Sequence, residues 1–232
     1  KILDMRIESN LEQKLNSFHP QVVGVTGYTT DVYNVIKILQ RIKTFDHNIL
    51  TIVGGHHATV MPEDFDKEFI DVIVIGEGEA TFPELIDVYQ KRKDFGNIKG
   101  LAFRKNSKLI FTQSRETSTN LDTLLLPARV LTKKYRQKYF RGDWRPVASL
   151  MSSKGCPFRC NFCALWKITN GKYLIRSPES VVNELSTIEE KYIDFADDNV
   201  LHDLRRAEKI YELIKVSGIE KKYKVYARSD TI

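Results

Sequence analysis

The chain has 232 residues, of which 42% are hydrophobic and 28% charged, and this is the composition of a globular protein with a sizeable core. No apolar run approaches the ~20 residues that a membrane-spanning helix needs, and no signal peptide is visible. The net charge is +6, and basic residues alternate with aromatic ones in 133–141 and 221–224. Such stretches can mark nucleic-acid binding, but no nucleic-acid-binding module accompanies them, so nucleic acid is not an expected partner.

Residues 1–120 are predicted to form an α/β domain around a parallel sheet. Buried strands are expected at 22–26, 49–53 and 72–75, with helices at 33–45, near 62–69 and at 82–89. Continuous β-branched strands separated by helices indicate a Rossmann-like parallel sheet that is covered on both faces. Two further runs, 98–103 and 109–112, flank a polar tripeptide, which predicts a hairpin at the end of the domain.

Residues 121–145 are basic and lack a clean periodicity, which predicts a linker. From 146 to 232 a second alternation begins, with strands expected at 147–151, 192–196 and 224–228 and the last helix at 204–216. Ser177 and Pro178 are typical N-cap and N1 residues, so a helix is expected to begin there. This order predicts the first half of a (β/α) barrel, whose functional site lies at the C-terminal ends of its strands.

Both ends of the chain look cut. It begins in a strand-like run, 1–5, and it stops at Ile232 directly after another. We therefore expect a fragment that lacks the start of the first domain and the end of the barrel, and that is inactive by itself.

Three cysteines, Cys156, Cys160 and Cys163, lie within eight residues in the spacing C-x3-C-x2-C. Three thiolates without a fourth can hold three irons of a [4Fe–4S] cubane and leave the fourth iron open. A structural zinc site is the weaker alternative, because it needs four ligands and no nearby residue supplies the fourth. A disulfide with one spare thiol is the other alternative, but the tight spacing favours metal. A cytoplasmic location is expected, because thiols stay reduced there.

Small residues follow each of the three strands predicted in the first domain. The segments are Thr26 to Thr30, Gly54 to Thr59 and Gly76 to Glu79. Such residues let backbone amides approach a ligand closely at the carboxyl edge of a parallel sheet, so three in register predict a nucleotide- or corrin-sized pocket. None of them is a G-x-G-x-x-G or Walker A sequence, which disfavours a nicotinamide or ATP site.

Polar residues end the second and third strands of the predicted barrel. Asp197 and Asp198 could bind an ammonium group, and capping of the next turn, also open to Asn199, is an equal alternative. Arg228 could face a carboxylate or solvent, whereas Arg176 is assigned to the surface.

At the cysteine loop, where Phe162 directly precedes the last cysteine, the chain resembles the radical S-adenosylmethionine (radical SAM) superfamily. Upstream, Gly54-Gly55-x-His57-Ala58-Thr59 and Gly76-Glu77-Gly78-Glu79 resemble the cobalamin-dependent class of these enzymes. The resemblance implies a [4Fe–4S] cluster on the three cysteines. S-adenosylmethionine would bind the open iron through its amino and carboxylate groups and be cleaved to a 5′-deoxyadenosyl radical.

The resemblance also implies roles for individual residues, although no catalytic residue is assigned. Cobalamin contacts are expected at Thr26, Tyr28, Gly54, Gly55, His57, Gly76 and Gly78. Contacts to S-adenosylmethionine or substrate are expected at Phe162, Asp197, Asp198 and Arg228. The cobalamin signature D-x-H-x-x-G is absent, which argues against a histidine ligand below the cobalt.

The expected reaction is methyl transfer to an unactivated carbon of a small-molecule or lipid-like substrate, with an electron donor such as flavodoxin or ferredoxin. One alternative is a radical SAM enzyme without cobalamin that performs cyclisation, rearrangement or oxidative chemistry. Another is a transfer-RNA methylthiotransferase, which would require a second cysteine triad. A non-catalytic iron–sulfur sensor is the third.

Overall fold

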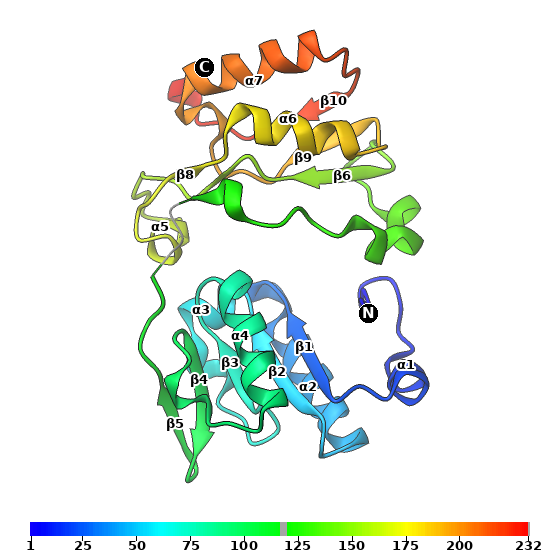
Figure 1. Ribbon diagram of the computed structural model, residues 1–232, viewed down its shortest axis with the longest axis vertical. Coiled ribbons are helices and arrows are strands. Elements are labelled where there is room, and N and C mark those ends of the chain that lie inside the picture. The colour runs from blue at the N-terminus through cyan, green and yellow to red at the C-terminus, as the bar shows by residue number, and fades with distance from the viewer. Residues whose placement is uncertain (117–119, 232) are drawn as a thin grey trace. The chain divides into compact units, whose positions relative to one another are not determined.

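A computed structural model describes residues 1–116 and 120–231 of the chain (Figure 1). These residues form two compact units, one of Asn10–Thr117 and one of Lys1–Ser9 together with Ser118–Ile232. The first nine residues thus belong to the C-terminal unit, where the backbone N–H of Asp4 donates to the Tyr135 hydroxyl at 3.1 Å. The strand expected at 1–5 is wrong, because residues 1–4 have no regular structure and 5–7 form a turn.

The unit Asn10–Thr117 is built on one five-stranded sheet. Its strands lie in the order β1-β2-β3-β4-β5, where β1, β2 and β3 are parallel and β4 and β5 are antiparallel. The strands are β1 (Val22–Thr26), β2 (Leu50–Gly54), β3 (Val72–Val74), β4 (Leu101–Lys105) and β5 (Lys108–Phe111). The parallel sheet and the terminal hairpin that the sequence predicts are therefore confirmed.

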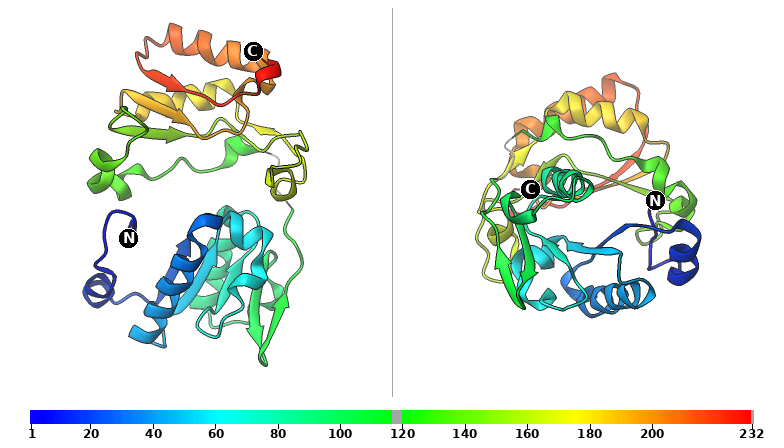
Figure 2. Two further views of the ribbon diagram at one scale, coloured as in Figure 1. Left: turned by 180° about the vertical axis from the view of Figure 1, so that it is seen from behind. Right: turned by 60° about the horizontal axis from the view of Figure 1, so that its bottom comes forward.

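Helices cover both faces of this sheet, as Figures 1 and 2 show. The two longest, α2 (Val32–Phe45) and α4 (Gly78–Gln90), lie on opposite faces. The unit also contains α1 (Leu11–Phe18), α3 (His56–Val60) and short 3₁₀ helices at Thr29–Asp31, Pro62–Phe65 and Phe95–Asn97. Because successive strand residues point to opposite faces, Val53 packs with Leu39 of α2 on one face, whereas Ile52 packs with Leu85 of α4 on the other.

Several helices of this unit differ from the prediction. The helix α3 was not expected, and the helix predicted near 62–69 is only a 3₁₀ helix at Pro62–Phe65. The sequence analysis missed α1, whose short amphipathic stretch buries only Leu11 and Leu15. The helix α4 begins at Gly78, so Pro83 lies inside it rather than at its start. Thr81 and Leu85 are both fully buried, so α4 packs into the core from its first turn onward.

The C-terminal unit has a three-stranded parallel sheet in the order β10-β9-β6. Its strands are β6 (Val147–Leu150), β9 (Tyr192–Phe195) and β10 (Lys222–Lys224), and the helices α6 (Pro178–Thr187) and α7 (Leu204–Val216) lie on the same side of it (Figure 1). The core between sheet and helices includes Leu150, Leu185 and Ile193. This sequential strand–helix alternation confirms the predicted start of a (β/α) barrel.

Several elements of this unit depart from expectation. Strand β10 ends at Lys224, where the predicted strand begins, so Arg228 lies beyond it in a loop. A two-stranded ribbon, β7 (Ser153–Lys154) with β8 (Leu174–Ile175), and the helix α5 (Leu165–Ile168) were not foreseen. The predicted linker contains 3₁₀ helices at Leu121–Thr123 and Arg129–Lys138, and two more lie at Val200–His202 and Ser229–Thr231. Over the described ranges, no helix is long and apolar enough to cross a membrane.

Candidate functional site: the cysteine loop and the glycine loops

The cysteine loop runs from β7 to α5, directly beyond the carboxyl end of β6. Cys156, Cys160 and Cys163 are half-buried and free of disulfides. A backbone hydrogen bond of 3.1 Å from the Cys163 N–H to the Cys160 carbonyl closes a tight turn at the end of the motif. The loop thus offers three thiols at the end of a barrel strand, where barrel sites form.

Gly155 starts the loop and is required there. Its φ is +87°, and a Cβ at this position would overlap the Lys172 carbonyl oxygen and lie 3.0 Å from Thr169 Cγ2. Only glycine adopts such a backbone without strain in so little space. The Gly155 N–H donates to Asp198 Oδ2 at 3.2 Å, which connects the loop to the end of β9.

Three aromatic rings and one guanidinium hold the middle of the loop. Arg228 lies over the Phe158 ring with its central carbon 3.8 Å from the ring centre. The Phe158 ring also packs edge-to-face on His202, with 5.7 Å between ring centres, and His202 packs edge-to-face on Tyr173 at 4.7 Å. His202 follows β9 and Arg228 follows β10 in the sequence, whereas Tyr173 directly precedes β8.

The three glycine loops of the unit Asn10–Thr117 meet at the carboxyl edge of β1, β2 and β3. The Gly76 N–H donates to Thr59 Oγ1 at 3.0 Å, and that hydroxyl donates to the Gly55 carbonyl at 2.9 Å. Gly55 has a φ of +102°, and a Cβ there would lie 2.5 Å from Thr26 Oγ1. The tertiary structure therefore brings together the small residues that the sequence places after successive strands.

The outer surface of this edge is open. A Cβ built on Gly76 or Gly78 would meet nothing within 4 Å, and Tyr28 is 62% exposed beside the ring of His56 at 6.1 Å. His57 differs from the others, because it is buried and both ring nitrogens have partners. Its Nδ1 lies 3.1 Å from Thr29 Oγ1 and its Nε2 lies 2.9 Å from Asp64 Oδ2. His57 thus stabilises the loops, and Tyr28 and the glycines form the accessible surface.

Comparison with known proteins agrees with this arrangement. Residues 1–86 match the B12 binding domain family. An uncharacterized methyltransferase of Pyrococcus horikoshii is 32% identical over all of this chain and 52% of its own length. The hopanoid C-3 methylase of Methylococcus capsulatus is 31% identical over all of this chain and 45% of its own length. The chain therefore resembles the cobalamin-dependent radical SAM enzymes.

The fold of the chain is also that of a solved structure. OxsB, a cobalamin-dependent S-adenosylmethionine radical enzyme with aqua-cobalamin and S-adenosylmethionine bound, superposes with a TM-score of 0.81 at 20% identity. The match covers 100% of this chain and 34% of OxsB. The chain thus spans about half the length of the curated relatives and a third of this structural neighbour.

The residues present fit the two groups that the family implies. Three free thiols lie on one short loop, and thiolates are the ligands that iron–sulfur clusters use. Among the described side chains, no three His, Cys, Asp or Glu converge closely enough to hold a metal as they stand. The open glycine edge offers unobstructed backbone at Gly76 and Gly78, which fits a large flat macrocycle.

Asp197 and Asp198, adjacent in the sequence, occupy opposite environments. Asp197 is 3% exposed, and its carboxylate accepts hydrogen bonds from the Ser152 N–H at 2.7 Å, the Ser152 hydroxyl at 2.6 Å and the Ser153 hydroxyl. Asp198 is exposed and accepts from the Gly155 N–H. The next turn is the 3₁₀ helix Val200–His202, and Asn199 occupies its N-cap position without a side-chain cap hydrogen bond. Asp197 thus joins β9 to the segment that leads into the cysteine loop.

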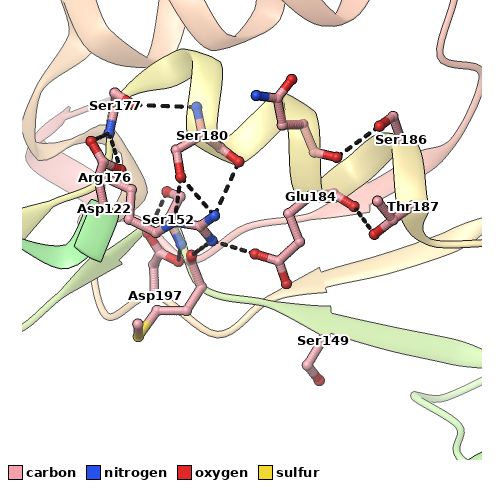
Figure 3. Close-up of polar contacts among 12 residues, drawn as sticks. Asp122, Ser149, Ser152, Arg176, Ser177, Ser180, Glu184, Ser186, Thr187 and Asp197 are labelled. Atoms are coloured by element: carbon pink, nitrogen blue, oxygen red, sulfur yellow. Dashed lines mark hydrogen bonds and ion pairs between the residues drawn. The ribbon is translucent and has the colours of Figure 1, made fainter. Parts of the chain in front are cut away.

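Arg176, which the sequence analysis assigned to the surface, is buried beneath this segment (Figure 3). Its guanidinium donates to the Met151 carbonyl at 2.9 Å, to the Ser180 carbonyl at 3.0 Å and to the Glu184 carboxylate. Glu184 is 1% exposed and also accepts from Arg129 at 2.6 Å. Its partners come from α6 and from the residue that follows β6, so its burial depends on tertiary packing that a local pattern does not show.

Arg206 and Phe162 complete the surroundings of the cysteine loop. Arg206 is buried and donates to the Ser152 carbonyl at 2.6 Å and to the Arg176 carbonyl at 2.9 Å. The sequence analysis missed it, since a basic residue in an amphipathic helix is typical of a solvated face. Phe162 is 89% exposed and so is available to contact a ligand at the loop.

Arg228 is the residue whose surroundings differ most from expectation. Its Nε and Nη2 donate to the two carboxylate oxygens of Asp230 at 2.9 and 2.7 Å, and its Nη1 donates to Cys160 Sγ at 3.4 Å. The hydrogen bond to Asp230 is the main cause that holds the pKa of Arg228 above its usual range. Arg228 therefore contacts the thiol loop directly.

Proposed function

We propose that this chain contains the cofactor-binding parts of a methyltransferase that transfers a methyl group to an unactivated carbon. Cobalamin binds at the glycine loops, and a [4Fe–4S] cluster binds on Cys156, Cys160 and Cys163. The single observation that carries the proposal is the cysteine loop at the end of β6, in a chain whose first 86 residues match a B12 binding domain. When bound, the cluster supplies the electron that cleaves S-adenosylmethionine to a 5′-deoxyadenosyl radical.

The protein's own residues bind and orient these groups. Gly155 allows the loop to leave β7 with a positive φ, and Asp198 holds it there by accepting from the Gly155 N–H. Thr26, Gly54 and Gly55 pack closely at the sheet edge, where a Cβ on Gly55 would overlap Thr26 Oγ1. The exposed Tyr28, Gly76 and Gly78 can lie against a macrocycle.

Methylation is favoured because the two curated relatives are named as a methyltransferase and a methylase. The substrate is a small or lipid-like molecule. A donor such as flavodoxin or ferredoxin supplies the electron, and the need for reduced thiols favours the cytoplasm. A transfer-RNA methylthiotransferase would need a second cysteine triad, and this chain has three cysteines in all.

The test uses the full-length protein, purified and reconstituted with iron and sulfide without oxygen. Iron and sulfide content, retained hydroxocobalamin and 5′-deoxyadenosine formation are measured together. We expect all three for the wild type, and we expect Cys160→Ala to lose iron while it retains cobalamin. Iron content that is unchanged in Cys160→Ala would overturn the cluster assignment.

A second pair of variants tests the cobalamin site. Gly78→Leu adds a side chain where an added Cβ meets nothing, so the fold accepts it but the open edge is filled. We expect it to lose cobalamin and keep the cluster, whereas Ala80→Leu, exposed on the same helix, keeps both. A wild type that holds a cluster and forms 5′-deoxyadenosine but retains no cobalamin would instead indicate a cobalamin-free radical SAM enzyme. Cluster binding without 5′-deoxyadenosine would indicate an iron–sulfur sensor.

A further inference from the structure

Arg228 is held in a fixed orientation beside the cysteine loop. Asp230 accepts from its Nε and Nη2 in a fork geometry, at 2.9 and 2.7 Å, which fixes the plane of the guanidinium. The remaining terminal nitrogen, Nη1, donates to Cys160 Sγ at 3.4 Å. The two residues are 68 positions apart in the sequence, so the contact depends on the barrel fold.

The same guanidinium also holds the loop through its aromatic residue. Arg228 lies over the face of Phe158 at 3.8 Å, within the range in which a cation is attracted to an aromatic ring. Phe158 lies between Cys156 and Cys160 and is supported by the edge-to-face ring of His202 at 5.7 Å. Arg228 thus contacts the loop at one thiol and at the ring beside it.

The contacts of Arg228 with the protein involve all three guanidinium nitrogens, which donate to the two oxygens of Asp230 and to Cys160 Sγ. A guanidinium carries five N–H groups, so the expected recognition of the S-adenosylmethionine carboxylate stays a prediction. The sulfur of Cys160 is the one acceptor of the three that belongs to the loop itself.

We propose that Arg228 is a positioning residue for the cysteine loop and that it raises the reduction potential of the cluster held there. This inference rests on the proposed function. One-electron reduction adds negative charge to a cluster that three thiolates already make anionic. A fixed cation and an N–H···S hydrogen bond stabilise that charge, and hydrogen bonds to cluster sulfurs are among the factors that set such potentials. A higher potential makes reduction by the cell's electron donor easier.

The experiment measures the midpoint potential of the cluster in the reconstituted full-length protein, by redox titration followed by electron paramagnetic resonance. Arg228→Gln is compared with Arg228→Lys and with Arg205→Gln, an equal loss of charge at an exposed position of α7. We expect Arg228→Gln to lower the equilibrium constant for reduction about tenfold, which is about 59 mV for one electron. Lysine should restore part of this shift, and Arg205→Gln should behave as the wild type.

The outcomes separate this inference from the function on which it rests. A wild type that binds no cluster would overturn the proposed function, whatever Arg228 does. A wild-type cluster with the same midpoint in all three variants would overturn the role of Arg228 alone. If Arg228→Gln binds less iron than Arg205→Gln, the loop depends on Arg228 for its position, and the midpoint of Arg228→Lys then tests the effect on the potential.

Discussion

Replacing Gly155 by alanine should destabilise the C-terminal unit far more than the same replacement at Gly171. Both glycines have positive φ, +87° and +68°, so both variants suffer the left-handed penalty of about 1–2 kcal/mol. At Gly171 an added Cβ meets nothing within 4 Å, whereas at Gly155 it overlaps the Lys172 carbonyl oxygen and lies 3.0 Å from Thr169. Overpacking of this kind costs about 1–3 kcal/mol. We therefore expect a loss of ~2–5 kcal/mol for Gly155→Ala, against ~1–2 kcal/mol for Gly171→Ala.

Urea unfolding of the apoprotein followed by tryptophan fluorescence measures this difference. The two tryptophans, Trp144 and Trp166, both belong to the C-terminal unit, so the signal reports on that unit. Any gain from the less flexible unfolded chain is common to both variants and cancels in the comparison. Equal losses for the two variants would refute the reasoning, because the contact with Lys172 would then have no energetic effect. In the reconstituted protein, Gly155→Ala should also bind less iron than Gly171→Ala.

Three further predictions concern buried charges of the same unit. Asp197→Ala removes the acceptor of three hydrogen bonds and should cost about 3–5 kcal/mol in urea unfolding, and a loss below ~1 kcal/mol would contradict its role. Arg176→Met should cost a similar amount, because it removes a cation that pairs with the buried carboxylate of Glu184. The double variant Arg176→Met with Glu184→Leu should recover part of the lost stability, and no recovery would count against a buried ion pair. Burial raises the pKa of Glu190, but the hydrogen bond from Arg136 outweighs it and holds the pKa below its ordinary value. The ionised Glu190 therefore stabilises the folded protein fully above about pH 4.3, and this stabilisation is lost as the pH falls further. Wild type and Glu190→Gln should then converge in their free energy of unfolding on acidification. A difference that stays constant with pH would exclude this linkage.

Local patterns were sufficient for most of the architecture. The strands β1, β2, β6 and β9 and the helices α2 and α7 lie at or within a residue or two of their predicted bounds. The N-cap at Ser177 is also confirmed, because its hydroxyl accepts from the Ser180 N–H at 3.2 Å. These features depend on side-chain periodicity and on short-range hydrogen bonds, which the order of residues along the chain already specifies.

Elements without a strong local signal were the ones that the sequence analysis missed or displaced. The ribbon of β7 and β8 has two residues per strand, and its pairing joins Ser153 to Ile175 across the whole cysteine loop. Strand β10 is shorter and earlier than expected, because its register with β9 pairs Lys222 with Tyr192. Register between distant strands depends on tertiary packing rather than on propensity.

The sequence by itself determined the chemistry that this protein can offer: three thiols spaced for one cluster and glycines after three parallel strands. The tertiary structure decided which neighbours act on that chemistry. Asp197 is buried against Ser152, whereas Asp198 is exposed and contacts Gly155. Adjacent residues in an extended chain point to opposite sides, but the sequence does not say which of the two points inward. The contact of Arg228 with Cys160 likewise joins residues 68 positions apart, and only the folding of β6, β9 and β10 into one sheet brings them together.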